Sequence, residues 1–266
     1  ALVMLRPRIS PCLLLRNSGL VKTKQFTDDK YVGDPINAVK IFNEKSVDEL
    51  LVIDIDASRL GIEPDYRVIE KLANESRMPL CYGGGIKTIR QAERIIQLGV
   101  EKVAISSAVL EAPLLIRQLS EIIGSQSIVC VLDVKKSIFK GYEIYINNGK
   151  KKIKGSLIHW IETFQEYGAG EILINSIDRD GMQNGYDLAL VALIKKYITI
   201  PVTFLGGASS LDDIGDLIET FGVVGCAAGS LFVFKGKYRA VLISYPSFSE
   251  KYELVLSRLT KFENSL

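Results

Sequence analysis

Short apolar runs recur along the chain, and each is followed by a stretch whose apolar positions have helical spacing. Strand-like runs that alternate with amphipathic stretches are typical of parallel strands joined by crossover helices. We expect strands at Ile9–Leu15, Glu49–Ile55, Pro79–Tyr82, Lys102–Ser106, Ile128–Val134, Glu171–Ser176, Pro201–Leu205 and Gly225–Ala228. Eight such units predict an α/β fold of the (βα)8 type, the TIM barrel.

The second half of the chain repeats the first. Three pairs of segments correspond: Glu49–Asp56 (ELLVIDID) with Glu171–Asp178 (EILINSID), Gly84–Ile86 (GGI) with Gly206–Ala208 (GGA), and Ala104–Ser107 (AISS) with Ala227–Ser230 (AAGS). A doubly wound open sheet also alternates strands and helices, but it predicts no equivalent halves. We therefore expect a barrel made of two similar (βα)4 halves.

The chain has 266 residues and 47% hydrophobic content, and barrels of this size are often one domain. Between the fifth strand and its helix, Tyr142–Ile153 alternates apolar and polar residues around Asn148-Gly149, which is a type I′ hairpin signal. We predict a single barrel domain over residues 1–266 with a hairpin insertion near 142–153.

The charges of the chain are nearly balanced, with 33 Lys and Arg, 31 Asp and Glu and a net charge of +2. Such a chain has no strong field to draw it onto nucleic acid. No apolar stretch approaches the roughly 18 to 20 residues of a membrane helix, and Ala1–Ser10 lacks the apolar region of a signal peptide. We expect neither nucleic acid nor a membrane as the principal partner.

All four cysteines, Cys12, Cys81, Cys130 and Cys226, lie inside apolar runs without CxxC or Cys/His spacing. They are typical of buried free thiols in a reducing compartment. We predict a cytoplasmic protein with no metal site and no cofactor. The one histidine, His159, falls in a predicted helix over Ser156–Tyr167, so a mechanism with a histidine base is disfavoured.

Each half carries glycines after one strand and small residues after the next. Gly84, Gly85, Ser106 and Ser107 form the first set, and Gly206, Gly207, Gly229 and Ser230 form the second. Glycine lets backbone N–H groups approach a phosphate, although a single glycine pair more often makes only a tight turn. Two copies at matching positions favour a ligand with a phosphate at each end, held across the barrel mouth.

Carboxylates near the predicted strand ends are the candidate proton-transfer groups. Asp133 follows an apolar run where packing gives no reason for a charge, and catalytic groups of barrels lie at these ends. Asp54 and Asp180 are further candidates, although Asp180 belongs to an Asp-Gly turn that organises loops equally well. We expect Asp56 and Asp178 to organise loops.

Four charges of mixed sign, Arg8, Glu49, Lys102 and Glu171, lie at the opposite ends of the strands. Strand alternation places Lys102 on the face of Ser106, and Glu171 on the face of Asn175. We expect a salt-bridged layer across the barrel floor. Its role is either stability or the gating of a small molecule, and the spacing does not distinguish the two.

Several motifs together resemble the cyclase subunit of imidazole glycerol phosphate synthase, the HisF type, from Leu5 to Phe234. These motifs are Arg8-Ile9, Pro11-Cys12-Leu13, Gly83-Gly84-Gly85-Ile86, Gly168–Gly170 and Ser176–Gly181 (SIDRDG). In that family a glutaminase partner releases ammonia, which passes a charged gate in the barrel floor and reacts with a bisphosphate at the mouth. The resemblance implies that Arg8, Glu49, Lys102 and Glu171 match the gate.

The sequence departs from this family at the catalytic pair. Asp133 matches one of its two carboxylates, but Leu14 stands where the other is expected. Leucine cannot transfer a proton, and loss of a positioned acid or base removes about 10²- to 10⁴-fold in rate. Leu205 and Asn175 also replace a small polar residue and a threonine of the family.

A narrower resemblance rests on Leu5–Arg8, Pro11–Leu15, Tyr31–Asn43 and Phe232–Pro246. These segments are similar to the cyclase-like proteins of acetamidino-sugar modification in surface polysaccharide (lipopolysaccharide O-antigen) biosynthesis. The resemblance implies two partners, a class I glutaminase in a heterodimer and a sugar amidotransferase. It also leaves a phosphate-bearing small molecule as the ligand of the mouth.

Three functions follow from these resemblances. The chain passes ammonia from a glutaminase to a sugar-modifying partner, or it is an authentic cyclase (a lyase of histidine biosynthesis) in which Asp54 or Asp180 replaces the missing acid. The third is a scaffold without catalysis.

Overall fold

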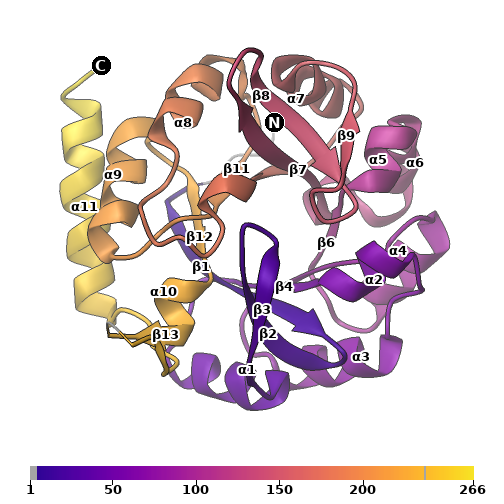
Figure 1. Cartoon of the computed structure of the whole chain (residues 1–266), viewed down its shortest axis with the longest axis horizontal. Coiled ribbons are helices and arrows are strands. Elements are labelled where there is room, and N and C mark those ends of the chain that lie inside the picture. The colour runs from indigo at the N-terminus through magenta and orange to yellow at the C-terminus, as the bar shows by residue number, and fades with distance from the viewer. Residues whose placement is uncertain (1–4, 237) are drawn as a thin grey trace.

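Eight parallel strands close into a barrel in a computed structural model that describes residues 5–236 and 238–266. They are β1 (Arg8–Arg16), β4 (Leu50–Asp54), β5 (Leu80–Gly83), β6 (Lys102–Ile105), β7 (Ile128–Ser137), β10 (Glu171–Ser176), β11 (Val202–Leu205) and β12 (Gly225–Ala228). Neighbours pair in chain order, the β6–β7 and β12–β1 pairings join the two halves, and the β7–β10 pairing completes the closed barrel (Figure 1). The predicted (βα)8 fold is confirmed.

Helices surround the barrel (Figure 1). They are α1 (Pro35–Glu44), α2 (Ile55–Leu60), α3 (Tyr66–Glu75), α4 (Ile89–Gln97), α5 (Ser107–Glu111), α6 (Leu114–Ile123), α7 (Leu157–Glu166), α8 (Leu188–Ile194), α9 (Leu211–Phe221), α10 (Ser230–Val233) and α11 (Phe248–Glu263), with 3-10 turns η1 (Ser125–Ser127), η2 (Ile177–Arg179) and η3 (Lys195–Tyr197). Equivalent helices α4 and α9 both begin with a capping box, at Thr88 and Ser210. None of the helices in the described part of the chain has the length and apolar character to cross a bilayer.

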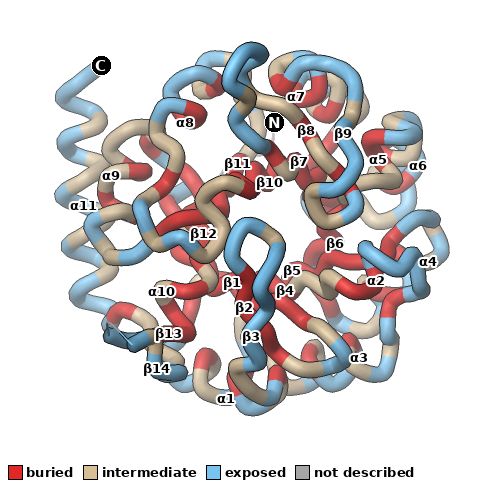
Figure 2. The backbone as a smooth tube through the Cα atoms, in the orientation of Figure 1, coloured by how far each residue is buried: buried red, intermediate tan, exposed pale blue. Residues whose placement is uncertain are grey.

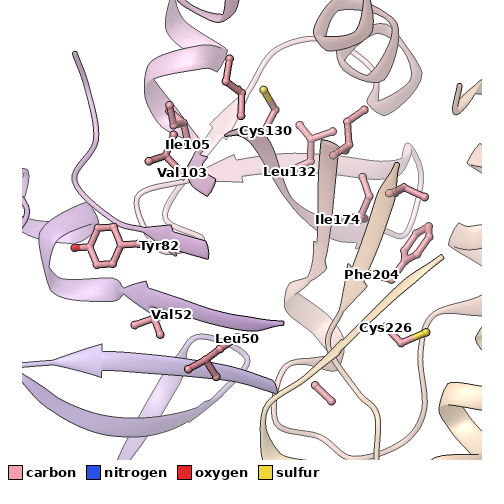
Figure 3. Packing of buried hydrophobic residues seen from close by; sticks show 14 of the residues in the cluster. Leu50, Val52, Tyr82, Val103, Ile105, Cys130, Leu132, Ile174, Phe204 and Cys226 are labelled. Carbon is pink, nitrogen blue, oxygen red and sulfur yellow. The ribbon is translucent and has the colours of Figure 1, made fainter. Parts of the chain in front are cut away.

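The main core lies between the strands and the helices. Alternate strand residues point outward into it, among them Val52, Val103, Leu132, Ile174 and Phe204 (Figure 3). Figure 2 shows the buried chain following the strands and the inner faces of the helices. Because alternation is strict in a strand, the residues between these point into the barrel.

A second, smaller apolar cluster fills the barrel interior. Its buried members are Cys12, Leu14, Val21, Leu51, Cys81, Ala104, Val129, Val131, Leu173, Leu205 and Ala227. The four cysteines are buried free thiols, as predicted. We call four members of this cluster, Ala104, Val131, Leu173 and Ala227, the lumen lining.

The first strand of each half continues into an antiparallel hairpin. β1 pairs with β2 (Gly19–Lys24), which pairs with β3 (Thr27–Gly33). In the same way β7 pairs with β8 (Gly141–Ile146), which pairs with β9 (Lys151–Ile153). The sequence predicts only the second hairpin. A further short pair, β13 (Phe234–Lys235) and β14 (Ala240–Val241), follows α10.

The predicted turn of the second hairpin is wrong in detail. Ile146 pairs with Lys151, so the connection is a four-residue loop rather than a two-residue type I′ turn. Asn147, Asn148 and Gly149 all have positive φ, and an asparagine tolerates this conformation better than most residues. The left-handed run therefore starts one residue earlier than the Asn-Gly signal indicates.

Candidate functional site

An open cavity lies at the carboxyl ends of the strands, and its empty volume of about 1250 Å³ includes the open solvent at the mouth. Both halves line it, since the lining includes all eight predicted phosphate-cradle residues: Gly84, Gly85, Ser106, Ser107, Gly206, Gly207, Gly229 and Ser230. We call the first four the N-half cradle and the last four the C-half cradle. The structure thus brings the two predicted sets together around one opening.

The cradle glycines are required by the backbone. Gly84 and Gly206 occupy equivalent positions with φ of +124° and +110°. A Cβ on Gly84 would lie 2.4 Å from the Asp54 carbonyl oxygen, and one on Gly206 would lie 2.8 Å from that of Ser176. These glycines therefore make tight turns in any case, and such turns also leave N–H groups accessible.

Positive charge gathers at the C-half cradle. Lys22 is buried and lines the cavity, and a Cβ on Gly229 would lie 2.0 Å from its Nζ. Arg239 donates from Nη2 to Ser230 Oγ over 3.3 Å. Within residues 5–236 and 238–266, no carboxylate forms an ion pair with either cation, so their charge is available to an anion.

The sequence analysis missed both cations. Lys22 lies on β2, a strand that was not predicted, and Arg239 follows the last barrel strand in a segment without strong periodicity. The available signal was a lysine flanked by Val21 and Thr23 in a short apolar run.

Asp133 and Asn175 form a pair at the top of the lumen. They are register partners on β7 and β10, and Asn175 Nδ2 donates to Asp133 Oδ1 over 3.1 Å. Burial raises the pKa of Asp133 to about 7, against the effect of this hydrogen bond. Asn175 Oδ1 is buried without a partner among the described residues. Asp133 can therefore take up or release a proton near neutral pH.

Leu14 forms part of an apolar wall of the cavity. It belongs to the same cluster as Leu205 and Ile53, and all three line the opening. Among the described residues, the carboxylates that line the cavity belong to Asp133 and Asp180. The wall formed by Leu14, Leu205 and Ile53 therefore contributes no carboxylate to the mouth.

Asp180 is engaged in holding the first hairpin. Its Oδ2 accepts from Thr23 Oγ1 at 2.6 Å and from the Phe26 backbone N–H at 3.0 Å. Asp54 does not line the cavity, and its Oδ1 caps α2 by accepting from the N–H groups of Asp56 and Ala57. The prediction of Asp54 as a catalytic group is therefore not supported, because its carboxylate is turned into a helix cap.

Asp56 and Asp178 organise loops, as predicted. Asp56 accepts from the Asn17 N–H in the β1–β2 turn and pairs with Arg59 at 3.0 Å. Asp178 Oδ2 accepts from the Lys136 N–H on the extended part of β7. His159 is exposed on α7 with its ring edge toward Trp160, far from the strand ends in sequence and outside the cavity lining.

The four predicted floor charges form a closed ring of ion pairs. Arg8 contacts Glu49 at 2.7 Å and Glu171 at 2.9 Å, while Lys102 contacts Glu49 at 3.0 Å and Glu171 at 2.9 Å. Signs alternate around this floor ring, so its net charge is zero. It lies directly beneath the lumen lining and closes that end of the barrel.

The ring favours the charged forms of Arg8, Lys102 and Glu171, but not that of Glu49. Burial opposes the charge of Lys102, but the attraction of Glu171 and Glu49 exceeds it and raises the pKa of Lys102. At Glu171, burial is outweighed by the attraction of Lys102 and Arg8, so the pKa of Glu171 is lowered. At Glu49, burial and the negative charge of Glu171 dominate, so the pKa of Glu49 is raised. Glu49 is therefore the member of the ring that accepts a proton most readily.

A fifth side chain, missed by the sequence analysis, braces the ring. Thr203 Oγ1 donates to Glu171 Oε1 over 2.6 Å. A Cβ on Gly225 would lie 1.9 Å from this hydroxyl oxygen, so glycine at that position makes the room for Thr203.

Comparisons with known proteins agree with this geometry. A family model described as "Histidine biosynthesis protein" matches residues 8–239. The chain is 59% identical to a protein of Vibrio vulnificus named as imidazole glycerol phosphate synthase subunit hisF3, over 93% of this chain and 96% of the relative. It is 53% identical to subunit hisF2 of Pseudomonas aeruginosa, over 93% and 98%; both names give the assignment as provisional.

A relative named without that qualification is imidazole glycerol phosphate synthase subunit HisF of Natranaerobius thermophilus. It is 38% identical over 87% of this chain and 92% of the relative. The chain thus matches proteins of both kinds over nearly their whole lengths. It belongs to the histidine biosynthesis protein family, among the HisF-type subunits of imidazole glycerol phosphate synthase.

Proposed function

We propose that this barrel receives ammonia at its floor from a class I glutaminase and passes it through the lumen to a sugar amidotransferase. That partner would use the ammonia to form the acetamidino group of a surface-polysaccharide sugar. The observation that carries the proposal is Leu14 in the wall of the mouth, in a barrel that keeps its floor ring and its apolar lumen.

Cyclisation with general acid–base catalysis needs two proton-transfer groups placed on either side of the substrate. Asp133 supplies one such group, with a pKa suited to the task. Leu14 supplies nothing, and Asp180 is committed to Thr23 and Phe26. This arrangement favours transfer of ammonia over chemistry on the family's own substrate.

The interior suits the passage of a small neutral molecule. The lumen lining lies above the floor ring. Its four side chains are small or aliphatic: Ala104, Val131, Leu173 and Ala227. These four side chains offer no hydrogen bonds to ammonia, and an apolar wall disfavours ammonium because an unpaired ion is costly to bury. The first polar groups above them are Asp133 and Asn175, in the same register on neighbouring strands.

The floor ring would have to open for ammonia to enter. It is held by four ion pairs, and its members already carry opposite charges in a closed arrangement. A docked glutaminase can open the ring if it offers the floor cations or carboxylates alternative partners. We assign Arg8, Glu49, Lys102 and Glu171 to this gate.

The two cradles would still bind a phosphate-bearing small molecule at the mouth. Lys22 and Arg239 at the C-half cradle supply the charge for it, and the cradle glycines supply accessible N–H groups. Binding of this ligand does not require the missing acid.

An authentic cyclase is the second candidate, and one assay separates the two. The purified chain is given the cyclase substrate with an ammonium salt, which removes the need for a glutaminase. We expect no imidazole glycerol phosphate, because Leu14 provides no proton. Robust turnover would overturn the proposal.

A scaffold without a channel is the third candidate. Replacing gate residues Lys102 and Glu171 together keeps the charge of the ring balanced, and sugar amidation is then measured with glutamine as the nitrogen source. We expect the rate to change in this variant. An unchanged rate would favour the scaffold.

A further inference from the structure

A local excess of positive charge is hidden by the balanced composition of the chain. Residues 135–154 contain one acidic residue, Glu143, and seven lysines: Lys135, Lys136, Lys140, Lys150, Lys151, Lys152 and Lys154. The rest of the chain is consequently net acidic. All seven lysines are exposed, and within the described residues only Lys152 pairs with a carboxylate, that of Glu143.

These lysines do not serve the mouth cavity. None of the seven lines it, although Asn147 and Asn148 of the same hairpin do. A ligand in the cavity therefore does not account for them.

The turn between β7 and β8 presents two large apolar side chains to solvent. Ser137 pairs with Gly141, so Ile138, Phe139 and Lys140 form a three-residue turn, which we call the tip. Ile138 and Phe139 are each 92% exposed. Gly141 has φ of +72°, as a three-residue hairpin loop requires at its end.

The tip is held at the outer edge of the barrel. In Figure 2 the turn from β7 to β8 is exposed chain at the rim, between α7 and α8. Below it, Asp178 accepts from the Lys136 N–H and fixes the base of the hairpin. The two apolar side chains are therefore presented on an anchored element, beside Lys135 and Lys136.

We propose that this tip binds the surface of an anionic lipid membrane, with Ile138 and Phe139 inserted among the headgroups and the surrounding lysines paired with lipid phosphates. Two apolar side chains are too few for the core of a protein interface of about 800 Å² per partner. They suffice for reversible insertion when basic residues supply a second attraction. The overall charge balance, from which we expect no membrane as the principal partner, does not reveal this local patch. The inference does not depend on the proposed function.

Vesicle sedimentation of the full purified chain tests the proposal. The probes are vesicles of phosphatidylcholine alone and vesicles of phosphatidylcholine mixed equally with phosphatidylglycerol, at low and at high salt. We expect the protein to sediment with the mixed vesicles at low salt, to be released by high salt, and to stay in solution with phosphatidylcholine alone.

Two variants separate insertion from simple charge attraction. Ile138→Ser with Phe139→Ser should weaken partitioning by roughly tenfold or more, since each apolar side chain contributes about that factor when buried. Lys135→Gln with Lys136→Gln and Lys140→Gln should weaken it by roughly fivefold for each lysine. All five side chains are exposed, so the fold is preserved.

Matched controls change the same residue types elsewhere. Phe248→Ser with Tyr252→Ser removes a pair on α11 that is 76% and 58% exposed, and Lys40→Gln with Lys45→Gln and Lys71→Gln removes three exposed lysines. Both controls should bind vesicles like the wild type. No partitioning onto mixed vesicles, or partitioning that survives loss of the tip side chains, overturns the proposal.

Discussion

At the scale of single residues, Asp133 is the group whose protonation changes near neutral pH. Its folded pKa of about 7 lies above the ordinary value of an aspartate. Because the folded pKa is raised, the protonated form of Asp133 contributes most to the free energy of unfolding at acid pH. This contribution is lost as the pH rises from about 4 to about 7.

The Asp133→Asn variant should therefore be more stable than the wild type at pH 8, by about 2 kcal/mol after a discount for partial exposure. The difference should shrink steadily as the pH falls below 7. Urea denaturation of both proteins at pH 8 and pH 5 measures it. A difference that does not depend on pH would show that Asp133 titrates normally.

Leu14 provides the second prediction at this scale. Leu14→Asp places a carboxylate in the wall shared with Leu205, which should cost about 1–3 kcal/mol of unfolding free energy. It should also make ammonium-dependent cyclisation measurable, because the mouth regains a second proton-transfer group opposite Asp133. Leu14→Asn is the control with similar shape and polarity. Equal activity of the two variants would show that proton transfer at this position is not the missing step.

At the scale of elements, two neighbouring aspartates each hold one hairpin. Asp180 accepts from Thr23 and Phe26 on the first hairpin, and Asp178 accepts from Lys136 on the second. The 3-10 turn η2 between their barrel strand and the loop thus anchors both extensions of the mouth.

Replacing one aspartate should loosen one hairpin. Asp180→Ala removes two hydrogen bonds and should raise opening of Gly19–Gly33 by roughly tenfold, while Asp178→Ala should act on residues 135–153 instead. Amide hydrogen exchange, resolved by peptide, measures both. Equal protection of the hairpins in the two variants would contradict these anchoring roles.

The barrel strands are predictable from sequence because their apolar runs and their repeat are local signals. The first hairpin is not, since its two turns use Asn17, Ser18, Gln25 and Phe26 at positive φ. Gln25 and Phe26 carry no turn signal of the glycine or asparagine kind. A tertiary contact from Asp180 to the Phe26 N–H holds that turn instead. Because strand β2 was not predicted, Lys22 on this strand was not recognised as a cavity residue.

At the scale of the whole molecule, the floor and the mouth are linked by strand alternation. Glu171, Leu173 and Asn175 follow one another on the same face of β10, from the floor ring through the lumen to the mouth. Alternation placed the floor charges correctly from sequence. Alternation along one strand did not show that Thr203 supports the floor ring. The hydroxyl of Thr203 reaches Glu171 on the neighbouring strand, and it fits there only because Gly225 has no side chain.

The ring should act as one unit in stability. Lys102→Met leaves Glu49 and Glu171 with a single cation, which should cost about 3–5 kcal/mol. Adding Glu49→Gln restores the charge balance, so the double variant should recover part of that loss. Urea unfolding of the double variant and of both single variants, Lys102→Met and Glu49→Gln, measures the coupling. A double variant as unstable as the sum of its parts would argue against a shared ring.

The central claim, passage of ammonia through the lumen, is tested most directly by blocking it. Ala104 lines the lumen, and Ala104→Leu adds bulk there, while Ala104→Ser is the control that leaves the passage open. The measurement is the ratio of glutamine-driven to ammonium-driven sugar amidation in the complex of barrel, glutaminase and amidotransferase. We predict that Ala104→Leu lowers this ratio to background with glutamine hydrolysis retained, and that Ala104→Ser keeps it. An unchanged ratio in the folded Ala104→Leu variant would contradict the account.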